Sequence, residues 1–175
     1  MHDKTLIIGG CRSGKSSHAL RLAEEIKGKK IFIATCIPHD NEMKKRVLNH
    51  RKERGRDWET VEAPLDLPEA ISDCAVRADV VIADCLTLWI SNLMIGKTGE
   101  KKTVMAVNRL VHSIKNAPSP VILVSNEVGA GIVPENRLAR AFRDSAGFVN
   151  QKVAATSNRV IWMVAGIPVV IKKVS

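Results

Sequence analysis

Aromatic side chains are scarce in this chain of 175 residues: Phe, Trp and Tyr together make up 3%, and tyrosine is absent. The formal net charge is nevertheless +9, and a basic chain can bind nucleic acid. Proteins that bind single-stranded nucleic acid usually place several aromatic rings among their cationic side chains. Only Trp58 lies near the basic segment 44–56 (KKRVLNHRKERGR). We therefore expect polyphosphate substrates and no nucleic-acid partner.

Closely spaced cysteines and long apolar runs are also missing. The four cysteines form no Cys-x-x-Cys pair, which suits reduced, buried thiols better than zinc ligands or disulfides, so we expect no structural metal. No apolar run is long enough to span a bilayer, and residues 1–4 lead into a short apolar strand instead of a signal peptide. We expect a cytoplasmic protein without stable membrane insertion, folded as one domain over residues 1–175.

Apolar runs typical of strands alternate with amphipathic helical patterns along the whole chain, without repeats or linkers. This alternation predicts the α/β class, with a mostly parallel sheet flanked by helices. Only residues 166–168 separate the last two strands, too few for a parallel crossover, so the final strand should be an antiparallel edge strand. We expect strands at 5–8, 30–34, 80–84, 121–125, 160–165 and 169–172. We expect helices at 15–26, 41–54, 67–76, 103–116 and 135–157.

A phosphate-binding pattern, G-x-x-x-x-G-K-[ST], follows the first expected strand. Its glycines allow a tight loop whose N–H groups converge on phosphate oxygens, Lys15 reaches the outer phosphates, and the Ser16 hydroxyl can ligate Mg²⁺. A glycine-rich turn that merely contains a lysine is the alternative, but the position between a strand and a helix favours a site for ATP or GTP. The loop consists of Gly9, Gly10, Cys11, Arg12, Ser13, Gly14, Lys15 and Ser16.

Two further segments follow expected strands and should lie on the same edge of the sheet. Asp84 ends the strand 80–84, where P-loop enzymes place a carboxylate that holds Mg²⁺ or its water shell. The alternative is that Asp84 caps a helix at 86–93. The polar segment 125–131 (SNEVGAG) could bind substrate or simply connect a strand to a helix.

A histidine lies among the basic residues of the expected helix 41–54. Histidine can attack phosphorus through a neutral nitrogen, and the arginines near His50 would stabilise the phosphate charge. A lone histidine on a basic helix is more often solvated or packed. These residues alone therefore leave the role of His50 open.

Longer motifs resemble one enzyme family over nearly the whole chain. They are 9–16 (GGCRSGKS), 33–35 (IAT), 41–51 (NEMKKRVLNHR), 58–64 (WETVEAP), 84–93 (DCLTLWISNL), 125–144 (SNEVGAGIVPENRLARAFRD) and 147–154 (GFVNQKVA). Together they resemble the bifunctional adenosylcobinamide kinase/adenosylcobinamide-phosphate guanylyltransferases of cobalamin biosynthesis. The block from 125 to 140 is far more specific than the P-loop.

This resemblance implies a RecA-like sheet, assembly as a homotrimer and two reactions. First, ATP or GTP phosphorylates a hydroxyl of adenosylcobinamide. Then GTP guanylylates a histidine of the enzyme, pyrophosphate leaves, and GMP passes to adenosylcobinamide phosphate to give adenosylcobinamide-GDP.

The family's site residues can be carried over to matching positions of this sequence. The histidine nucleophile falls on His50, and Lys15 is expected to be catalytic as well. Nucleotide contacts fall on residues 9–16 and on Ala34, Thr35, Cys36, Arg51, Lys52, Glu53, Arg54, Glu62 and Asp84; Ser16 and Asp84 are the expected Mg²⁺ ligands. At Cys11 the family commonly has alanine, and that side chain need not touch phosphate.

Two alternatives stay open: a P-loop kinase of a small metabolite without a covalent histidine, and a nucleotide-gated module that binds nucleic acid.

Overall fold

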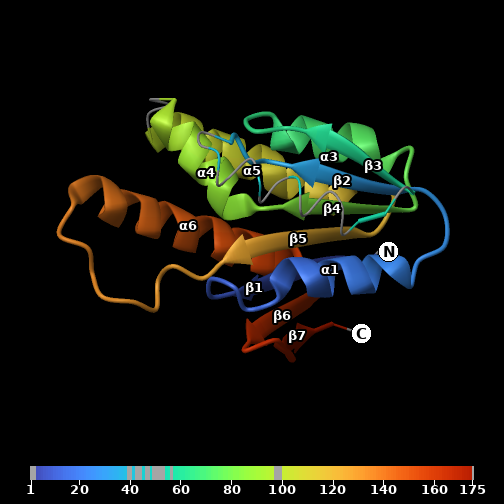
Figure 1. Ribbon diagram of the computed structural model, residues 1–175. Coiled ribbons are helices and arrows are strands. Elements are labelled where there is room, and N and C mark those ends of the chain that lie inside the picture. Colours follow the sequence, from blue (N-terminus) through green and yellow to red (C-terminus); the bar gives the residue numbers. More distant parts are fainter. Residues whose placement is uncertain are drawn as a thin grey trace.

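The computed structural model describes residues 3–38, 41, 45, 48, 54, 55, 57–96 and 100–174. Seven strands form one sheet in the order β3-β2-β4-β5-β1-β6-β7, with helices on both faces (Figure 1). Neighbouring strands are parallel except for the edge pair β6–β7, which is antiparallel. The strands are β1 (Lys4–Gly9), β2 (Lys30–Ala34), β3 (Trp58–Glu62), β4 (Val80–Asp84), β5 (Val121–Asn126), β6 (Arg159–Val164) and β7 (Ile167–Lys173).

The two faces of the sheet carry different helices. Against one face packs α1, whose Ala19 and Ala23 are buried together with Ile7, Ile82 and Ile161 of the strands. The other face is covered by α3, α4, α5 and α6, which enclose the larger apolar core. Because both faces are covered, the central strands are buried along nearly their whole length, as parallel strands usually are. The helices are α1 (Lys15–Glu24), α3 (Leu67–Ala75), α4 (Leu86–Ile95), α5 (Glu100–Asn116) and α6 (Arg137–Thr156).

The predicted fold class is confirmed, including the antiparallel edge strand. The expected strands 30–34 and 80–84 match β2 and β4 in full. The sequence did not predict β3, because its residues WETVE form neither a continuous apolar run nor a regular alternation of polar and apolar side chains, and the strand lies at the sheet edge. Helix α6 begins two residues later than expected because the Asn136 side chain caps it by accepting a hydrogen bond from Ala139 N–H. Most of the expected helix 41–54 lies outside the described residues.

The β6–β7 hairpin supports the loop that follows β1. Its turn contains Ala165 and Gly166, both with positive φ, as tight hairpin turns favour. Gly166 N–H donates a hydrogen bond to Ser13 O at 3.2 Å. On the other side of the loop, a Cβ atom at Gly9 would lie 2.5 Å from Met163 O of β6. Glycine at position 9 therefore allows the loop to lie directly against β6.

Within the described ranges, no helix is both long and apolar enough to cross a bilayer.

Candidate nucleotide site

The loop between β1 and α1 has the geometry that the sequence predicts for a phosphate-binding site. Gly14 caps α1 with a φ of 89°, a left-handed conformation that favours glycine. Lys15 is buried, and its Nζ donates hydrogen bonds to Gly10 O at 2.5 Å and to Ser13 Oγ at 3.4 Å. Burial lowers the pKa of Lys15, and the nearby Asp84 carboxylate opposes that shift. A poorly solvated ammonium group at a helix N-terminus is suited to binding an anion.

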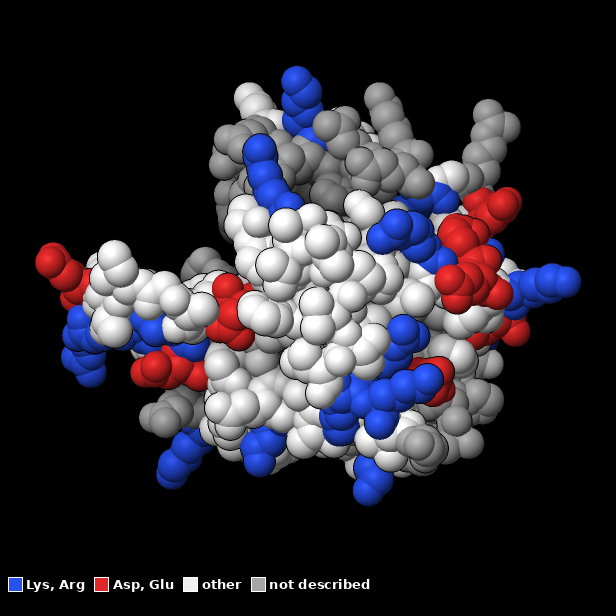
Figure 2. Space-filling model, turned by 90° about the horizontal axis from the view of Figure 1, so that it is seen from below, with Lys and Arg blue, Asp and Glu red and all other residues white. Residues whose placement is uncertain are grey.

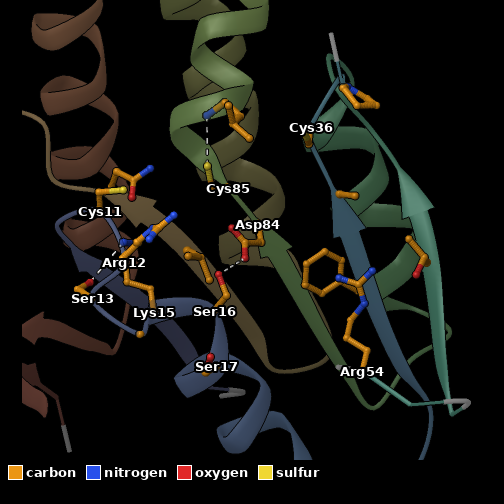
Figure 3. Close-up of a pocket in the computed structure, with 18 of the residues that line it drawn as sticks. Cys11, Arg12, Ser13, Lys15, Ser16, Ser17, Cys36, Arg54, Asp84 and Cys85 are labelled. Carbon is orange, nitrogen blue, oxygen red and sulfur yellow. Dashed lines mark hydrogen bonds between the residues drawn. The ribbon is translucent and has the colours of Figure 1, made fainter. Parts of the chain in front are cut away.

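Ser16 and Asp84 come together across the site. Ser16 lies in the first turn of α1 and Asp84 at the end of β4, and Ser16 Oγ donates a 2.6 Å hydrogen bond to Asp84 Oδ2 (Figure 3). Hydroxyl and carboxylate oxygens are the hard ligands that Mg²⁺ prefers, so this pair fits the predicted metal site. The alternative role for Asp84 is wrong: Cys85 caps α4, because its Sγ accepts a hydrogen bond from Leu88 N–H.

A cavity of about 710 Å³ opens in front of the loop, along the carboxyl ends of the strands. Residues of the loop form one wall, and residues from β2 and β3 form the opposite wall (Figure 3). Eleven of the predicted site residues line it: Cys11, Arg12, Ser13, Gly14, Lys15, Ser16, Ala34, Cys36, Arg54, Glu62 and Asp84. The structure thus brings most of the predicted nucleotide contacts into one cavity.

The remaining predicted residues lie elsewhere. Gly9 and Gly10 form the entrance of the loop without lining the cavity. Thr35 is fully buried; its Oγ1 donates to Cys85 O and accepts from Cys85 N–H, both at 2.8 Å, and so ties the end of β2 to the start of α4. Four predicted residues, His50, Arg51, Lys52 and Glu53, lie outside the described residues.

Arg54 is held on the wall opposite the loop. Its guanidinium carbon lies 3.7 Å from the centroid of the Phe32 ring, and its exposed fraction is 7%. A guanidinium over an aromatic face is attracted by the electrons of the ring. This contact keeps a cation facing the cavity.

Sequence reasoning did not include seven of the residues that line the cavity. Thr60 belongs to β3, the strand that the sequence did not predict, and Phe32 is a core residue of β2. Asn126 belongs to the segment 125–131, for which the sequence left open a role in binding substrate, and it lines the cavity. The seven are Ser17, Phe32, Pro38, Thr60, Cys85, Leu88 and Val124.

Cys85 contributes no thiolate to this site. Burial and the neighbouring Asp84 raise the pKa of its thiol to about 12. The thiol is therefore protonated at neutral pH and acts as a helix cap.

The sheet order, the loop between β1 and α1, and the Ser16–Asp84 pair define the class: an α/β protein with a P-loop NTPase-like fold. The family model described as "Cobinamide kinase / cobinamide phosphate guanyltransferase" matches residues 5–171. The chain belongs to this family, which confirms the resemblance of its motifs and the prediction that it is an enzyme.

Curated relatives agree with this assignment. The "Bifunctional adenosylcobalamin biosynthesis protein CobU" of Escherichia coli (strain K12) is 41% identical, over 95% of this chain and 98% of its own length. The protein of the same name from Salmonella typhimurium is 39% identical over the same shares. The "Bifunctional adenosylcobalamin biosynthesis protein CobP" of Pseudomonas aeruginosa is 38% identical, over 97% of each chain.

Proposed function

We propose that this protein phosphorylates adenosylcobinamide with ATP or GTP and then transfers GMP from GTP to adenosylcobinamide phosphate, giving adenosylcobinamide-GDP. The observation that carries the proposal is the cavity in front of the P-loop, in a chain that matches the family over residues 5–171. The volume of about 710 Å³ is in the range of small-molecule and cofactor sites.

In both reactions the nucleotide phosphates would lie in the loop. Phosphate oxygens would accept hydrogen bonds from the loop N–H groups and would replace Gly10 O as the partner of Lys15 Nζ. Lys15 would then neutralise the charge that develops on the phosphate in the transition state. Such electrostatic stabilisation is the main protein contribution to phosphoryl transfer.

Mg²⁺ is the proposed metal, with Ser16 and Asp84 as its protein-side partners. Their oxygens lie 2.6 Å apart at the edge of the same cavity. When bound, Mg²⁺ would neutralise the negative charge of the nucleotide phosphates.

His50 is the proposed nucleophile of the second reaction. Its imidazole nitrogen would form a bond to the α-phosphorus of GTP while the bond from that phosphorus to pyrophosphate breaks. A phosphate oxygen of adenosylcobinamide phosphate would then attack the same phosphorus, and the bond to the histidine would break. Support comes from the family motif around His50 and from Arg54, four residues later, which faces the cavity. We propose Arg51, Lys52, Glu53 and Glu62 as further nucleotide contacts.

Incubation with α-labelled GTP followed by denaturation tests the proposal. A guanylyltransferase that works through a covalent histidine retains the label, whereas a simple P-loop kinase releases it. The same protein should convert adenosylcobinamide to its phosphate with ATP or GTP as the phosphate donor. Absence of both the adduct and the phosphorylated product would overturn the proposal, and binding of RNA or DNA in their place would favour a nucleic-acid module.

We further propose that the enzyme is a homotrimer in the cytoplasm, where ATP and GTP are supplied. Support for self-association comes from the β6–β7 edge, whose apolar side chains Trp162, Ile167, Val169 and Ile171 are 43–64% exposed. The face of the molecule seen from this side has a central area without charged side chains (Figure 2). Apolar areas of this kind usually mark contacts between proteins.

A further inference from the structure

Asn126 is the last residue of β5, the strand between the P-loop strand and the strand that ends at Asp84. In the sheet, β5 lies between β1, which leads into the P-loop, and β4, which ends at Asp84. Asn126 is paired with Gly9, and Val124 of the same strand is paired with Asp84. Since neighbouring strands lie about 4.8 Å apart, the backbone of Asn126 lies directly beside the first residue of the P-loop.

The backbone of Asn126 is held by a closed ring of hydrogen bonds. Asn126 N–H donates to Thr87 Oγ1 at 2.8 Å, and Ser125 Oγ donates to Asn150 Oδ1 at 2.6 Å. Ser125 has one hydroxyl proton, so the 3.3 Å contact between Thr87 Oγ1 and Ser125 Oγ must have Thr87 as its donor. Asn150 Nδ2 donates to Asn126 O at 3.3 Å and closes the ring.

This ring joins three elements at the end of β5. Thr87 belongs to α4 and Asn150 to α6, and both helices pack on the same face of the sheet (Figure 1). Thr87, Ser125 and Asn150 are all buried. A buried network in which every donor has an acceptor is rigid, and the ring therefore fixes Asn126 relative to the sheet.

The side chain of Asn126 lies on the opposite face from this ring. Successive side chains of a strand alternate between faces: Ser125 contacts Asn150 of α6, whereas Val124 is buried in the core beneath α1. Asn126 and Val124 both line the nucleotide cavity. The Asn126 carboxamide forms no hydrogen bond with any residue that the structure describes. It is a donor on a fixed backbone that faces the cavity.

We propose that Asn126 is a catalytic residue of the kinase reaction and that its carboxamide N–H binds a non-bridging oxygen of the terminal phosphoryl group. This inference rests on the proposed function. The substrate hydroxyl oxygen forms a bond to the terminal phosphorus, the bond from that phosphorus to the bridging oxygen of the diphosphate breaks, and the hydroxyl proton passes to solvent. A donor already in place where charge develops costs no reorganisation during the reaction.

Guanylyl transfer takes place at the α-phosphorus, two phosphates away from the group that Asn126 contacts. Asn126 therefore touches the reacting phosphorus only in the kinase reaction. The two reactions of this one chain provide an internal comparison for its role.

Asn126→Ala tests this role, with Asn116→Ala as the matched control because Asn116 is exposed on α5 and contacts His112. The measurements are kcat and KM for phosphorylation of adenosylcobinamide, and the rate of adduct formation from α-labelled GTP. Loss of a single donor of this kind lowers kcat by about 10²–10³-fold. We expect that loss in phosphorylation by Asn126→Ala, whereas adduct formation at saturating GTP should fall by far less, because its reacting phosphorus lies away from Asn126.

Asn126→Asp covers the case in which Asn126→Ala does not fold, as judged from its thermal unfolding. It keeps the size of the side chain but replaces the donor with a carboxylate that repels phosphate, so at saturating GTP phosphorylation should fall much further than formation of the adduct. The inference is overturned if the folded variant phosphorylates adenosylcobinamide at the control rate, or if both reactions fall in parallel. If the unmutated protein performed neither reaction, the proposed function itself would be overturned, and the inference with it.

Thr87 is a positioning residue in this account, because it acts through the backbone of Asn126. Thr87→Val keeps the shape of the side chain and opens the ring, so it should lower kcat for phosphorylation and leave KM unchanged. Thr87→Ser keeps the hydroxyl and should restore kcat. Equal kcat values for Thr87→Val and the unmutated protein would show that the ring does not position Asn126.

Discussion

Ser16 Oγ donates a 2.6 Å hydrogen bond to Asp84 Oδ2 across the mouth of the nucleotide cavity. The two residues come from different elements, α1 and β4. Their contact places a hydroxyl and a carboxylate oxygen together beside Lys15. Burial lowers the pKa of Lys15, and the Asp84 carboxylate opposes part of that shift. This arrangement supports the proposal that the site binds a nucleotide together with a divalent cation.

Asp84→Asn should raise the Mg²⁺ concentration required for both reactions, because a neutral amide oxygen is a weaker partner for a hard cation than a carboxylate. The measurement is the rate of each reaction as a function of Mg²⁺ concentration. Asp73→Asn, on the exposed side of α3, is the matched control. An Mg²⁺ dependence equal to that of the control would show that Asp84 does not act on the metal.

Lys15→Ala should lower the rates of phosphorylation and of guanylyl transfer by orders of magnitude, since both rely on the charge of Lys15 at the phosphates. Lys15 is buried in the loop, so the fold of the variant is first checked by its thermal unfolding. Lys115→Ala, in the last turn of α5, is the control for loss of a lysine. Near-normal rates in a folded Lys15→Ala variant would remove the P-loop from the mechanism.

Much of the fold could be predicted because its strands are continuous apolar runs. The runs that form β2 and β4 define both strands in full. The glycines and Lys15 define the phosphate loop between β1 and α1. The strand β3 could not be predicted in this way, since Glu59, Thr60 and Glu62 interrupt its apolar residues at the edge of the sheet. Phe32 lies in a strand that was predicted in full, but its contact with Arg54 joins residues that are distant in the chain.

The roles of the site residues depend on hydrogen bonds that the spacing of residues in the sequence does not predict. Asp84 and Cys85 are adjacent, and either could cap the helix that follows; only the hydrogen bond from Leu88 N–H to Cys85 Sγ decides between them. The ring around Asn126 joins Thr87 to Asn150, which are far apart in the chain. No pattern of neighbouring residues predicts such a ring.

Lys4 should make stability depend on pH in the alkaline range. Its Nζ donates to Ala117 O at 2.7 Å and to Ser119 O at 2.6 Å, and burial lowers its pKa from 10.5 to about 8. Between pH 8 and 10.5 the unfolded chain therefore binds more protons at Lys4 than the folded protein does. The free energy of unfolding should consequently gain a contribution from Lys4 as pH rises through this window, and lose it as pH falls.

Denaturant unfolding of the unmutated protein and of Lys4→Met measures this contribution. The difference in free energy of unfolding between the two should shift in favour of the unmutated protein from pH 8 to 10.5, because Lys4→Met has no group to titrate there. A difference that stays constant across this window would contradict the lowered pKa.

The homotrimer should have a mass about three times the 19.2 kDa of one chain in light scattering. Val169 is 43% exposed and pairs with Trp162 in the hairpin. Val169→Lys should dissociate the trimer, because the substitution would place a charge in the apolar surface of β6 and β7. Val76→Lys, at the C-terminal end of α3 and 72% exposed, is the matched control. A monomeric unmutated protein would contradict the assembly, and a trimeric Val169→Lys variant would place the contact elsewhere.

His50→Ala tests the central claim most directly, because His50 should be required for guanylyl transfer but not for phosphorylation. The measurement is the label that the denatured protein retains after incubation with α-labelled GTP, with His112→Ala as the control because His112 is exposed on α5. The account predicts an acid-labile, alkali-stable adduct in the unmutated protein and the control, and none in His50→Ala, which should still phosphorylate adenosylcobinamide. Formation of the same adduct by His50→Ala would contradict the account and leave His18, His39 and His112 as the histidines to test.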